Sequence, residues 1–489
     1  MNDTPLPSLR SRYGERYRWF LLLSVMVGTM ASIMSSTIVN VAIPGMSHHF
    51  ALGQERAQWV SSGFMVAMTV SMLTTPWLLG RYGYRRTYVG TMVLLLAGGV
   101  AGGLANDFSL VLLARVAEGL AAGVVQPIPA IIILRAFEPH EQGRASGIFG
   151  MGVVLAPAIG PSIGGVLVDL FGWRSIFFMV VPFCLASIWL AYKFVPTTAP
   201  GGVTAARAGG LDWRGLIIGL VGTLCLLNGL VELRGDAPIE ATLLLVSAVL
   251  SLALFVWWQK RLAAGGGAPL MNMALFGYRP FAMGSVVSFI YGAALFGSTY
   301  LLPVYMQVAL HLSASHVGTI MLPAGIVLAI TIAGVGRLAD RHPTWLLVSI
   351  GLALLAVSFT LMKVLTLGST LWLLVAFAII GRIGLGFILP SLNLGAMRPL
   401  AKPLIPQGAS AISFLRMLGG AAGVSLCAIA LEWRLAAHGD SLAQAASSPA
   451  RLAAFNEVFF MLSALCAIAI LAALQLRVGT AAPLPPKES

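Results

Sequence analysis

The chain has 489 residues, of which 58% are hydrophobic and only 10% are charged, and its formal net charge is +13. A soluble globular protein is about 25% charged, and a disordered chain combines low hydrophobicity with high charge, so both classes are excluded. A mean hydropathy of +0.90 favours a protein that crosses a membrane many times.

Continuous apolar runs, each long enough to cross a bilayer as a helix, follow one another along the chain. A hydrocarbon core about 30 Å thick needs roughly 20 apolar residues per helix, whereas a transmembrane β-barrel has alternating segments of about ten residues. We therefore expect an all-α integral membrane protein. The fourteen predicted spans are 19–43, 57–79, 87–105, 108–133, 145–168, 175–196, 214–233, 241–259, 281–308, 317–336, 344–365, 370–397, 409–432 and 455–476.

The positive charges are distributed unevenly between the two sides of these spans. With the N-terminus in the cytoplasm, 21 of the 30 Lys and Arg residues lie on the cytoplasmic side, six lie outside and three lie within spans. Cytoplasmic loops carry such an excess. The pattern therefore predicts a multi-pass protein of the cytoplasmic (inner) membrane with both termini cytoplasmic. Because the cations mark topology and do not cluster on one soluble face, we expect no nucleic-acid partner.

Three polar segments stand out between or after the spans. Residues 197–213 are rich in Gly, Ala and Thr and are typical of a flexible cytoplasmic linker. Residues 434–454 form the longest predicted outside loop, and residues 478–489 are predicted to be a disordered cytoplasmic tail.

A weak internal repeat relates the two ends of the chain. Gly80-Arg81, between spans two and three, aligns with Asp340-Arg341, between spans ten and eleven. Span four contains Arg115-x-x-x-Gly119 and span twelve contains Arg382-x-x-x-Gly386. Internal repeats of this kind occur in many transporters. The predicted organisation is an N-terminal six-helix bundle (1–196), a linker with two inserted helices (197–260), a C-terminal six-helix bundle (261–477) and the tail (478–489).

Four motifs, in order and on the expected spans, resemble the major facilitator superfamily, and more narrowly its fourteen-helix drug:proton antiporters, a family of multidrug efflux transporters. The resemblance implies two six-helix bundles plus two inserted helices. It also implies alternating access and export of small amphipathic compounds in exchange for protons. In a host with two membranes it implies a periplasmic adaptor and an outer-membrane channel as partners. The motifs are Ser36-Thr-Ile-Val-Asn40-Val-Ala-Ile-Pro44, Arg115-Val-Ala-Glu118-Gly119 followed by Gln126-Pro127, Ala156-Pro-Ala-Ile-Gly160-Pro161-Ser-Ile-Gly164-Gly165, and Gly336-Arg-Leu-Ala-Asp340-Arg341 followed by Arg416-x-x-Gly419-Gly420.

The chain departs from the family pattern at three positions. It has Ser35 and Gly80 where the family usually has Asp, and Glu118 where the family usually has Gln. The first departure argues against a preference for cationic drugs, and the third favours Glu118 as a proton site.

Glu118 is the one carboxylate in the middle of a predicted span. Charges inside a membrane are costly and usually mark a pathway or a paired site. Arg115 lies one helical turn earlier on the same face, so the two side chains can pair. Burial and a neighbouring Arg act on a carboxyl in opposite directions, so a conformational change can move a proton on or off. The hypotheses are proton coupling by Glu118 and Arg115, or a static structural ion pair.

Two further groups of residues are predicted to act in gating. Small residues let helices approach closely, and Pro bends a helix, so span five suits a hinge between the two bundles. Asp340 is expected to bind the N-terminus of the following helix or a nearby Arg in one conformation only. The alternatives are plain small-residue packing and solvated loop charges. The hinge and gating residues are Gly160, Pro161, Gly164, Gly165, Arg81, Asp340, Arg341 and Arg416.

Polar and aromatic side chains on spans one, four and nine can line an amphipathic substrate cavity. The alternative is that they pack or anchor at the membrane interface. The candidates are Ser35, Asn40, Gln126, Tyr291, Tyr300 and Gln307.

The two Arg residues inside later spans have no acidic partner in their own helices. We expect Arg416 to extend to the cytoplasmic interface, or else to add positive charge to the cavity or the gate, and Arg382 to bind backbone carbonyls. Positive potential near the cavity favours neutral or weakly anionic substrates over dications.

The sequence has no catalytic cluster and no metal-ligand spacing, so neither an enzyme nor a cofactor is predicted. The alternatives to an antiporter are a proton-coupled importer or a uniporter of the same fold, followed by a membrane-embedded sensor or enzyme.

Overall fold

The computed structural model describes residues 6–200, 209–233, 238–366, 369–440 and 449–477, which are helical and contain no strand. Thirteen helical segments in this part are long and apolar enough to cross a membrane. A further helix of 30 residues, α8 (Gln142–Phe171), brings the number to the predicted fourteen. The expected fold class is confirmed.

The N-terminal half contains six of these segments, two of which are interrupted at proline. Pro76 and Pro127 lack a backbone N–H and end the preceding helical hydrogen-bond ladder. The helices are α1 (Leu6–Tyr13), α2 (Tyr17–His49), α3 (Gln54–Ser71) continued by α4 (Thr75–Tyr82), α5 (Tyr84–Leu104), α6 (Phe108–Val125) continued by α7 (Ile128–Ala136), α8, and α9 (Ser175–Phe194).

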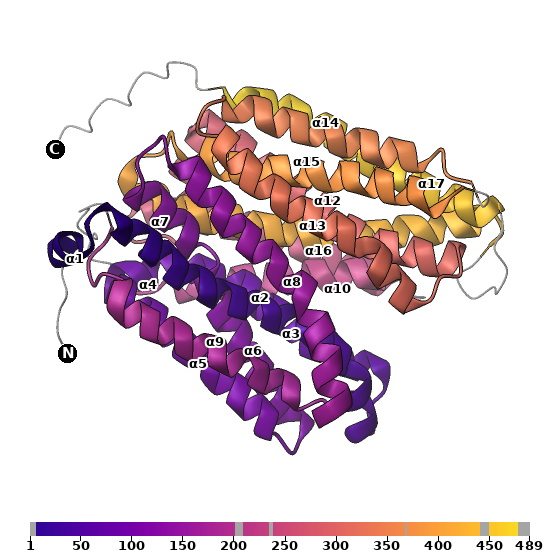
Figure 1. The fold of residues 1–489 in the computed structure, drawn as a ribbon, viewed down its shortest axis with the longest axis horizontal. Coiled ribbons are helices and arrows are strands. Elements are labelled where there is room, and N and C mark those ends of the chain that lie inside the picture. The colour runs from indigo at the N-terminus through magenta and orange to yellow at the C-terminus, as the bar shows by residue number, and fades with distance from the viewer. Residues whose placement is uncertain (1–5, 201–208, 234–237, 367–368, 441–448, 478–489) are drawn as a thin grey trace.

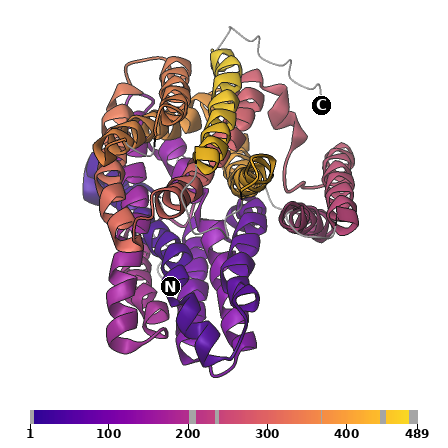
Figure 2. The same ribbon diagram turned by 90° about the vertical axis from the view of Figure 1, so that its right-hand side faces the viewer.

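Two inserted helices, α10 (Trp213–Glu232) and α11 (Pro238–Ala264), form a hairpin beside the two halves. Asp212 caps α10 by accepting a hydrogen bond from the Gly215 N–H, and it also accepts from Trp258 and Gln259 of α11. The hairpin contacts α3 of one half and α16 of the other, and Figure 2 shows it at the edge of the molecule.

The C-terminal half contains the last six segments. Its first helix passes into a π-helical turn over Tyr305–Ala309, directly after Pro303. The helices are α12 (Arg279–Val304), α13 (Ala314–Leu338), α14 (Thr344–Met362), α15 (Leu371–Met397), α16 (Ile405–Ala437) and α17 (Pro449–Ala473).

The predicted loop at 434–454 is largely wrong at its two ends, because α16 continues to Ala437 and α17 begins at Pro449. Alanine favours helix in both flanks. Residues 441–448 of this loop, 201–208 of the predicted linker and the predicted tail at 478–489 lie outside the described residues.

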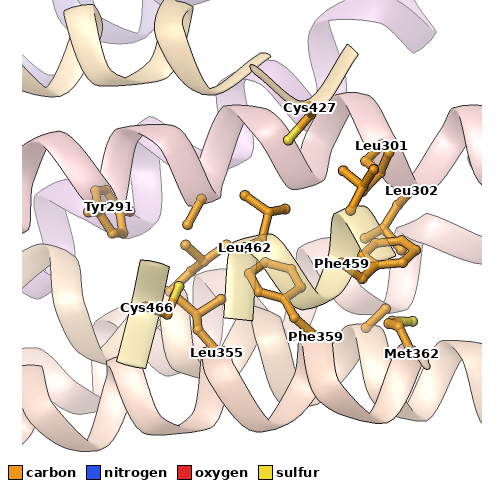
Figure 3. Close-up of a cluster of buried hydrophobic side chains, with 14 of the residues drawn as sticks. Tyr291, Leu301, Leu302, Leu355, Phe359, Met362, Cys427, Phe459, Leu462 and Cys466 are labelled. Atoms are coloured by element: carbon orange, nitrogen blue, oxygen red, sulfur yellow. The ribbon is translucent and has the colours of Figure 1, made fainter. Parts of the chain in front are cut away.

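Among the described residues, the two halves share hydrophobic clusters toward the end of the molecule that carries both chain termini, which we call the terminal end, and in a smaller cluster around Phe64 and Met417. One cluster there joins Leu22 and Phe137 to Val335 and Leu394. At the opposite end, a cluster around Trp173 contains residues of the N-terminal half alone. The largest cluster, drawn in part in Figure 3, is built almost entirely from the C-terminal half. Figure 1 accordingly shows the halves meeting near the termini and diverging away from them.

Candidate functional site

A fully buried ion pair lies at the centre of the N-terminal half. Arg115 and Glu118, on successive turns of α6, are 1% and 0% exposed. The Arg115 Nη1 atom is 2.5 Å from Glu118 Oε2. The guanidinium also stacks over the Phe64 ring, 4.2 Å from its centroid, and Nε donates to the Val60 carbonyl. The structure therefore places the two predicted residues in direct contact.

Ser35 of α2 completes this site. Its hydroxyl accepts a hydrogen bond from Arg115 Nη1 at 2.8 Å and donates one to Glu118 Oε2 at 3.2 Å. Ser35 is 1% exposed and bound to the ion pair in this conformation, and its place in the substrate cavity stays a prediction. This position follows from the helix packing, since α2 lies against α6 at this level.

The ion pair leaves two polar atoms unused. Glu118 Oε1 and Arg115 Nη2 are buried and have no hydrogen-bond partner among the described residues. Buried polar atoms without partners are costly, and each needs an explanation. A carboxylate oxygen in this state can take up a proton without first breaking a bond to another donor. The arrangement can therefore exchange one proton when access changes, although a static pair has the same geometry.

Asp340 connects the two halves at the terminal end. It lies in the turn after α13 and accepts hydrogen bonds from the backbone N–H groups of Gly143 and Arg144, at 2.6 and 2.8 Å. The N-terminus of a helix attracts negative charge. Partial burial raises the pKa of Asp340, and these two N–H donors and Arg398 oppose the rise. The predicted partners were the following helix, α14, or a nearby Arg. The structure places the carboxylate on the N-terminus of α8 of the other half, because α8 and α13 pack against each other, and it also places Arg398 beside it.

Arg398 makes a second connection beside Asp340. It lies just after α15, and its guanidinium donates to Gln142 Oε1 at 3.0 Å and to the Pro139 carbonyl at 2.8 Å. It is also 3.8 Å from Asp340 Oδ1. Arg398 was not predicted as a gating residue. The sequence feature that could have indicated it is a cation at the end of a predicted span.

The other charged residues of the predicted gate are placed differently. Arg81 and Arg341 are exposed at the terminal end. Arg135, which was not predicted, joins the halves there by donating to the Lys402 carbonyl and to the Tyr84 hydroxyl. Arg135 thus adds a further connection between the halves at the terminal end, apart from the one made by Asp340.

The predicted glycine motif of span five packs within one half. A Cβ atom at Gly164 would lie 2.4 Å from Ile38 of α2, and one at Gly160 would lie 3.1 Å from Thr37. No atom lies within 4 Å of the same position at Gly165. The close packing at Gly160 and Gly164 is therefore with α2 of the same half, and the hinge role of this motif stays a prediction. The Pro161 side chain lies outside what the structure describes, and α8 continues as helix through this position.

Glycines do bring the two halves together, but they lie at the opposite end of α8 from the predicted motif. A Cβ atom at Gly336 of α13 would lie 2.5 Å from the Gly143 carbonyl oxygen and 2.5 Å from Gly147 Cα. The backbones of α8 and α13 therefore touch. The available signal was the small-xxx-small spacing of Gly143 and Gly147, which permits such an approach in membranes.

Gly336→Val is expected to prevent closure of the terminal end and to reduce transport to background, because the two helix backbones leave no room for a side chain. Gly334→Val is the matched control, since no atom lies within 4 Å of a Cβ there. Spin labels at the exposed positions His140 and His342 measure the separation of the halves. We expect longer distances in Gly336→Val only. Equal distances and full transport in both variants would show that closure does not need this contact.

The remaining predicted cavity residues do not converge on one space. Gln307 is exposed in the π-helical turn, and Tyr300 packs against the C-terminal core. Asn40 is exposed and accepts a hydrogen bond from Ser61 at 2.7 Å. Gln126 is half-buried in the break between α6 and α7. These side chains thus have different surroundings in this conformation, and their place in one substrate cavity stays a prediction.

Tyr291 of α12 is 2% exposed and lies at the edge of the large C-terminal cluster (Figure 3). Its ring packs in the core because α12 is covered by α15, α16 and α17, and its place in the substrate cavity stays a prediction. The next residue, Gly292, touches α16, since a Cβ atom there would lie 2.0 Å from the Arg416 carbonyl oxygen.

Arg416 does not extend to the cytoplasmic interface, which leaves its predicted alternative role in the cavity or the gate, and Arg382 does not have the expected carbonyl partner in the part of the chain that the structure describes. Arg416 is the twelfth residue of α16 and does not lie at a helix end. Arg382 is 9% exposed and has no backbone carbonyl as a partner among the described residues. The structure thus places both cations deep in the C-terminal half. The described residues contain no group of three or more His, Cys, Asp and Glu side chains that can hold a metal ion.

Comparison with known proteins identifies relatives along most of the chain. The model of the Major Facilitator Superfamily matches residues 25–424. The chain is 28% identical to the uncharacterized MFS-type transporter YhcA of Bacillus subtilis, covering 88% of this chain and 79% of that protein. It is 27% identical to the multidrug resistance protein B homolog of Mycobacterium tuberculosis, covering 91% and 83%. Among solved structures, the proton:xylose symporter XylE has a TM-score of 0.67 at 12% identity, covering 94% of this chain and 95% of that one.

Proposed function

Because the chain belongs to the major facilitator superfamily, we propose that it is a proton-coupled antiporter that exports small amphipathic compounds across the cytoplasmic membrane. The observation that carries the proposal is the buried Arg115–Glu118–Ser35 site, in which a membrane-embedded carboxylate keeps one oxygen free. Relatives named multidrug resistance proteins support export of drug-like molecules. Each charge that crosses 100 mV contributes about 2.3 kcal/mol, so one proton can drive a useful substrate gradient.

Alternating access gives the two ends of the molecule different roles. The terminal end is closed in this conformation by Asp340 on α8, by Arg398 on Gln142 and by the glycine contact of α8 with α13. With the terminal end in the cytoplasm, this conformation faces outward and releases substrate. Loss of these contacts favours the inward-facing state. A ligand or proton that binds one of the two states better shifts the balance toward that state.

The proposed orientation predicts the accessibility of two exposed positions at opposite ends. In a background with all four native cysteines replaced by alanine, Asn106→Cys between α5 and α6 should react with a membrane-impermeant maleimide in intact cells. His140→Cys, between α7 and α8, should react only after permeabilisation. The reverse pattern would invert the topology.

Flux into proteoliposomes tests the proposed coupling directly. Permanently charged probes that differ in sign, ethidium and naphthalene-2-sulfonate, are added outside, with valinomycin and equal potassium to clamp the membrane potential. An antiporter accumulates its substrate when the lumen is acidic, an importer accumulates it when the outside is acidic, and a uniporter is indifferent to the gradient. We expect uptake of at least one probe with an acidic lumen, abolished by nigericin. Uptake that needs an acidic exterior, or no gradient at all, would overturn antiport.

In a host with two membranes, the proposal extends to a periplasmic adaptor and an outer-membrane channel as partners. Asn106 is exposed at the end of the molecule opposite the terminal end. Crosslinking of the Asn106→Cys variant to an adaptor in intact cells tests this extension.

A further inference from the structure

Two cations lie unpaired near the middle of the C-terminal half. Arg382 is the twelfth residue of the 27-residue helix α15, and Arg416 is the twelfth of the 33-residue helix α16. At 1.5 Å per residue, each lies about 17 Å from the nearer helix end. Neither has a hydrogen bond or an ion pair with any of the described residues. A cation at such depth without a protein partner must be hydrated or hold an anion.

The internal repeat shows that Arg382 lacks the acidic partner that Arg115 has. In the N-terminal half, Arg115 is neutralised by Glu118 three residues later. In the repeated motif, the position three residues after Arg382 is Leu385, which is 1% exposed. The C-terminal half therefore keeps the cation of the motif and lacks its carboxylate.

Arg382 lies on the face of α15 that turns toward the other half. Leu389, two turns later on the same face, lies 3.8 Å from the position of a Cβ at Gly150 of α8. The side chain of Arg382 is thus on the stripe that meets the N-terminal half, about 10 Å further from the terminal end than this contact.

A methionine-rich apolar cluster adjoins Arg416 and includes residues of both halves. Met417 packs with Phe64, Met68 and Met72 of the N-terminal half, and Met65 and Phe296 pack against them. Methionine side chains adapt to ligands of different shape. Met65 and Phe296 are only half-buried, and a cationic centre beside their adaptable apolar side chains matches an amphipathic anion.

We propose that Arg382 and Arg416 bind the anionic group of an amphipathic organic anion whose apolar part packs on this methionine-rich cluster. The proposal rests on the proposed export function and assigns its substrate class. Guanidinium groups bind carboxylates and other oxyanions through charge-assisted hydrogen bonds, often two at a time. Tyr291 directly precedes Gly292, at which a Cβ atom would lie 2.0 Å from the Arg416 carbonyl oxygen, and its phenol adds a neutral donor and no competing charge.

Equilibrium binding to the purified full chain in lipid nanodiscs tests the proposal without any proton gradient. The probe is naphthalene-2-sulfonate, and (2-naphthyl)trimethylammonium has the same rings with the opposite charge; empty nanodiscs give the partitioning blank. Loss of a hydrogen bond to a charged group costs roughly 1.5–3 kcal/mol, and 1.4 kcal/mol is a factor of ten. Arg382→Gln and Arg416→Gln should each weaken sulfonate binding at least about tenfold and leave binding of the cation unchanged or stronger.

Two kinds of variant control for charge and folding. Arg434→Gln removes the same charge at the exposed far end of α16, where Arg434 pairs with Glu457, and should bind the sulfonate like the unaltered protein. Arg382→Lys and Arg416→Lys keep the cation and should recover part of the affinity. Equal weakening in Arg434→Gln, or unaltered binding in both central Gln variants, would overturn the site. Displacement of the sulfonate by chloride at similar concentration would show an inorganic anion site and overturn the substrate class.

The two proposals fail separately. A protein that accumulates ethidium with an acidic lumen but does not bind naphthalene-2-sulfonate would retain the proposed antiport and refute the anion site. A protein that binds the sulfonate through Arg382 and Arg416 but shows no gradient-dependent uptake of either probe would retain the anion site and refute the coupling.

Discussion

Glu118→Gln is expected to abolish uptake driven by a pH gradient and to leave substrate exchange intact. The amide has nearly the same shape, and its oxygen can still accept from Arg115 Nη1, so the contacts around the site remain. An amide cannot take up and release a proton, however, and the free Oε1 position loses its function. Exchange of internal for external probe requires no net proton movement. The measurement is therefore gradient-driven uptake beside counterflow in the same proteoliposomes.

Glu240→Gln supplies the matched control, because Glu240 is a carboxylate at the exposed far end of α11. It should retain both activities. Loss of both uptake and counterflow in Glu118→Gln, with normal insertion, would assign Glu118 to substrate binding. Retention of gradient-driven uptake would leave the ion pair as a static structural element.

The parts of this fold that depend on local sequence were predictable. Continuous apolar runs gave the fourteen spans, and Pro127 falls at the break between α6 and α7. The Arg115–Glu118 contact also follows from local spacing, since residues three apart on a helix are neighbours. Helix ends were less predictable: α2 runs from Tyr17 to His49, beyond the predicted 19–43, because polar residues at a membrane surface can continue a helix.

The contacts that were not predictable join residues far apart in the chain. Ser35 and Glu118 are 83 residues apart, and Asp340 and Gly143 are 197 apart. Hydropathy and spacing identify a buried polar side chain but do not identify which neighbouring helix faces it. The same limit applies to small residues: spacing does not indicate that Gly164 packs against α2 while Gly147 contacts α13.

Conformation limits the prediction of a substrate cavity still further. In the proposed alternating-access cycle, the helices that carry the proposed lining residues would change their relative positions, so one sequence would serve two sets of contacts. Arg398 and Gly336 hold the terminal end together in the state described here, and the proposed cycle requires both contacts to be absent in the opposite state. A local pattern indicates that a residue is polar or small but does not indicate in which state it is used.

Arg115→Met is expected to destabilise the protein more than any other change considered, because it leaves the Glu118 carboxylate buried without its cation. Breaking a buried ion pair from one side costs about 3–5 kcal/mol. The substitution also removes the stacking on Phe64 and the hydrogen bonds to Ser35 and Val60. Methionine fills a similar volume, so the loss is electrostatic more than steric. Thermal unfolding in detergent, followed by fluorescence-detected size exclusion, measures the effect.

The double variant Arg115→Met/Glu118→Leu separates pairing from packing. Replacing a whole buried ion pair by apolar residues is often neutral or stabilising, so the double variant should unfold at a higher temperature than Arg115→Met alone. The exposed pair of Arg434 and Glu457 is the reference, and Arg434→Met should cause no measurable change, since exposed ion pairs contribute little. If Arg115→Met were as stable as the unaltered protein, Glu118 would already be protonated in this conformation. The proton would then be carried in the outward-facing state, and its release would require the opening of the terminal end.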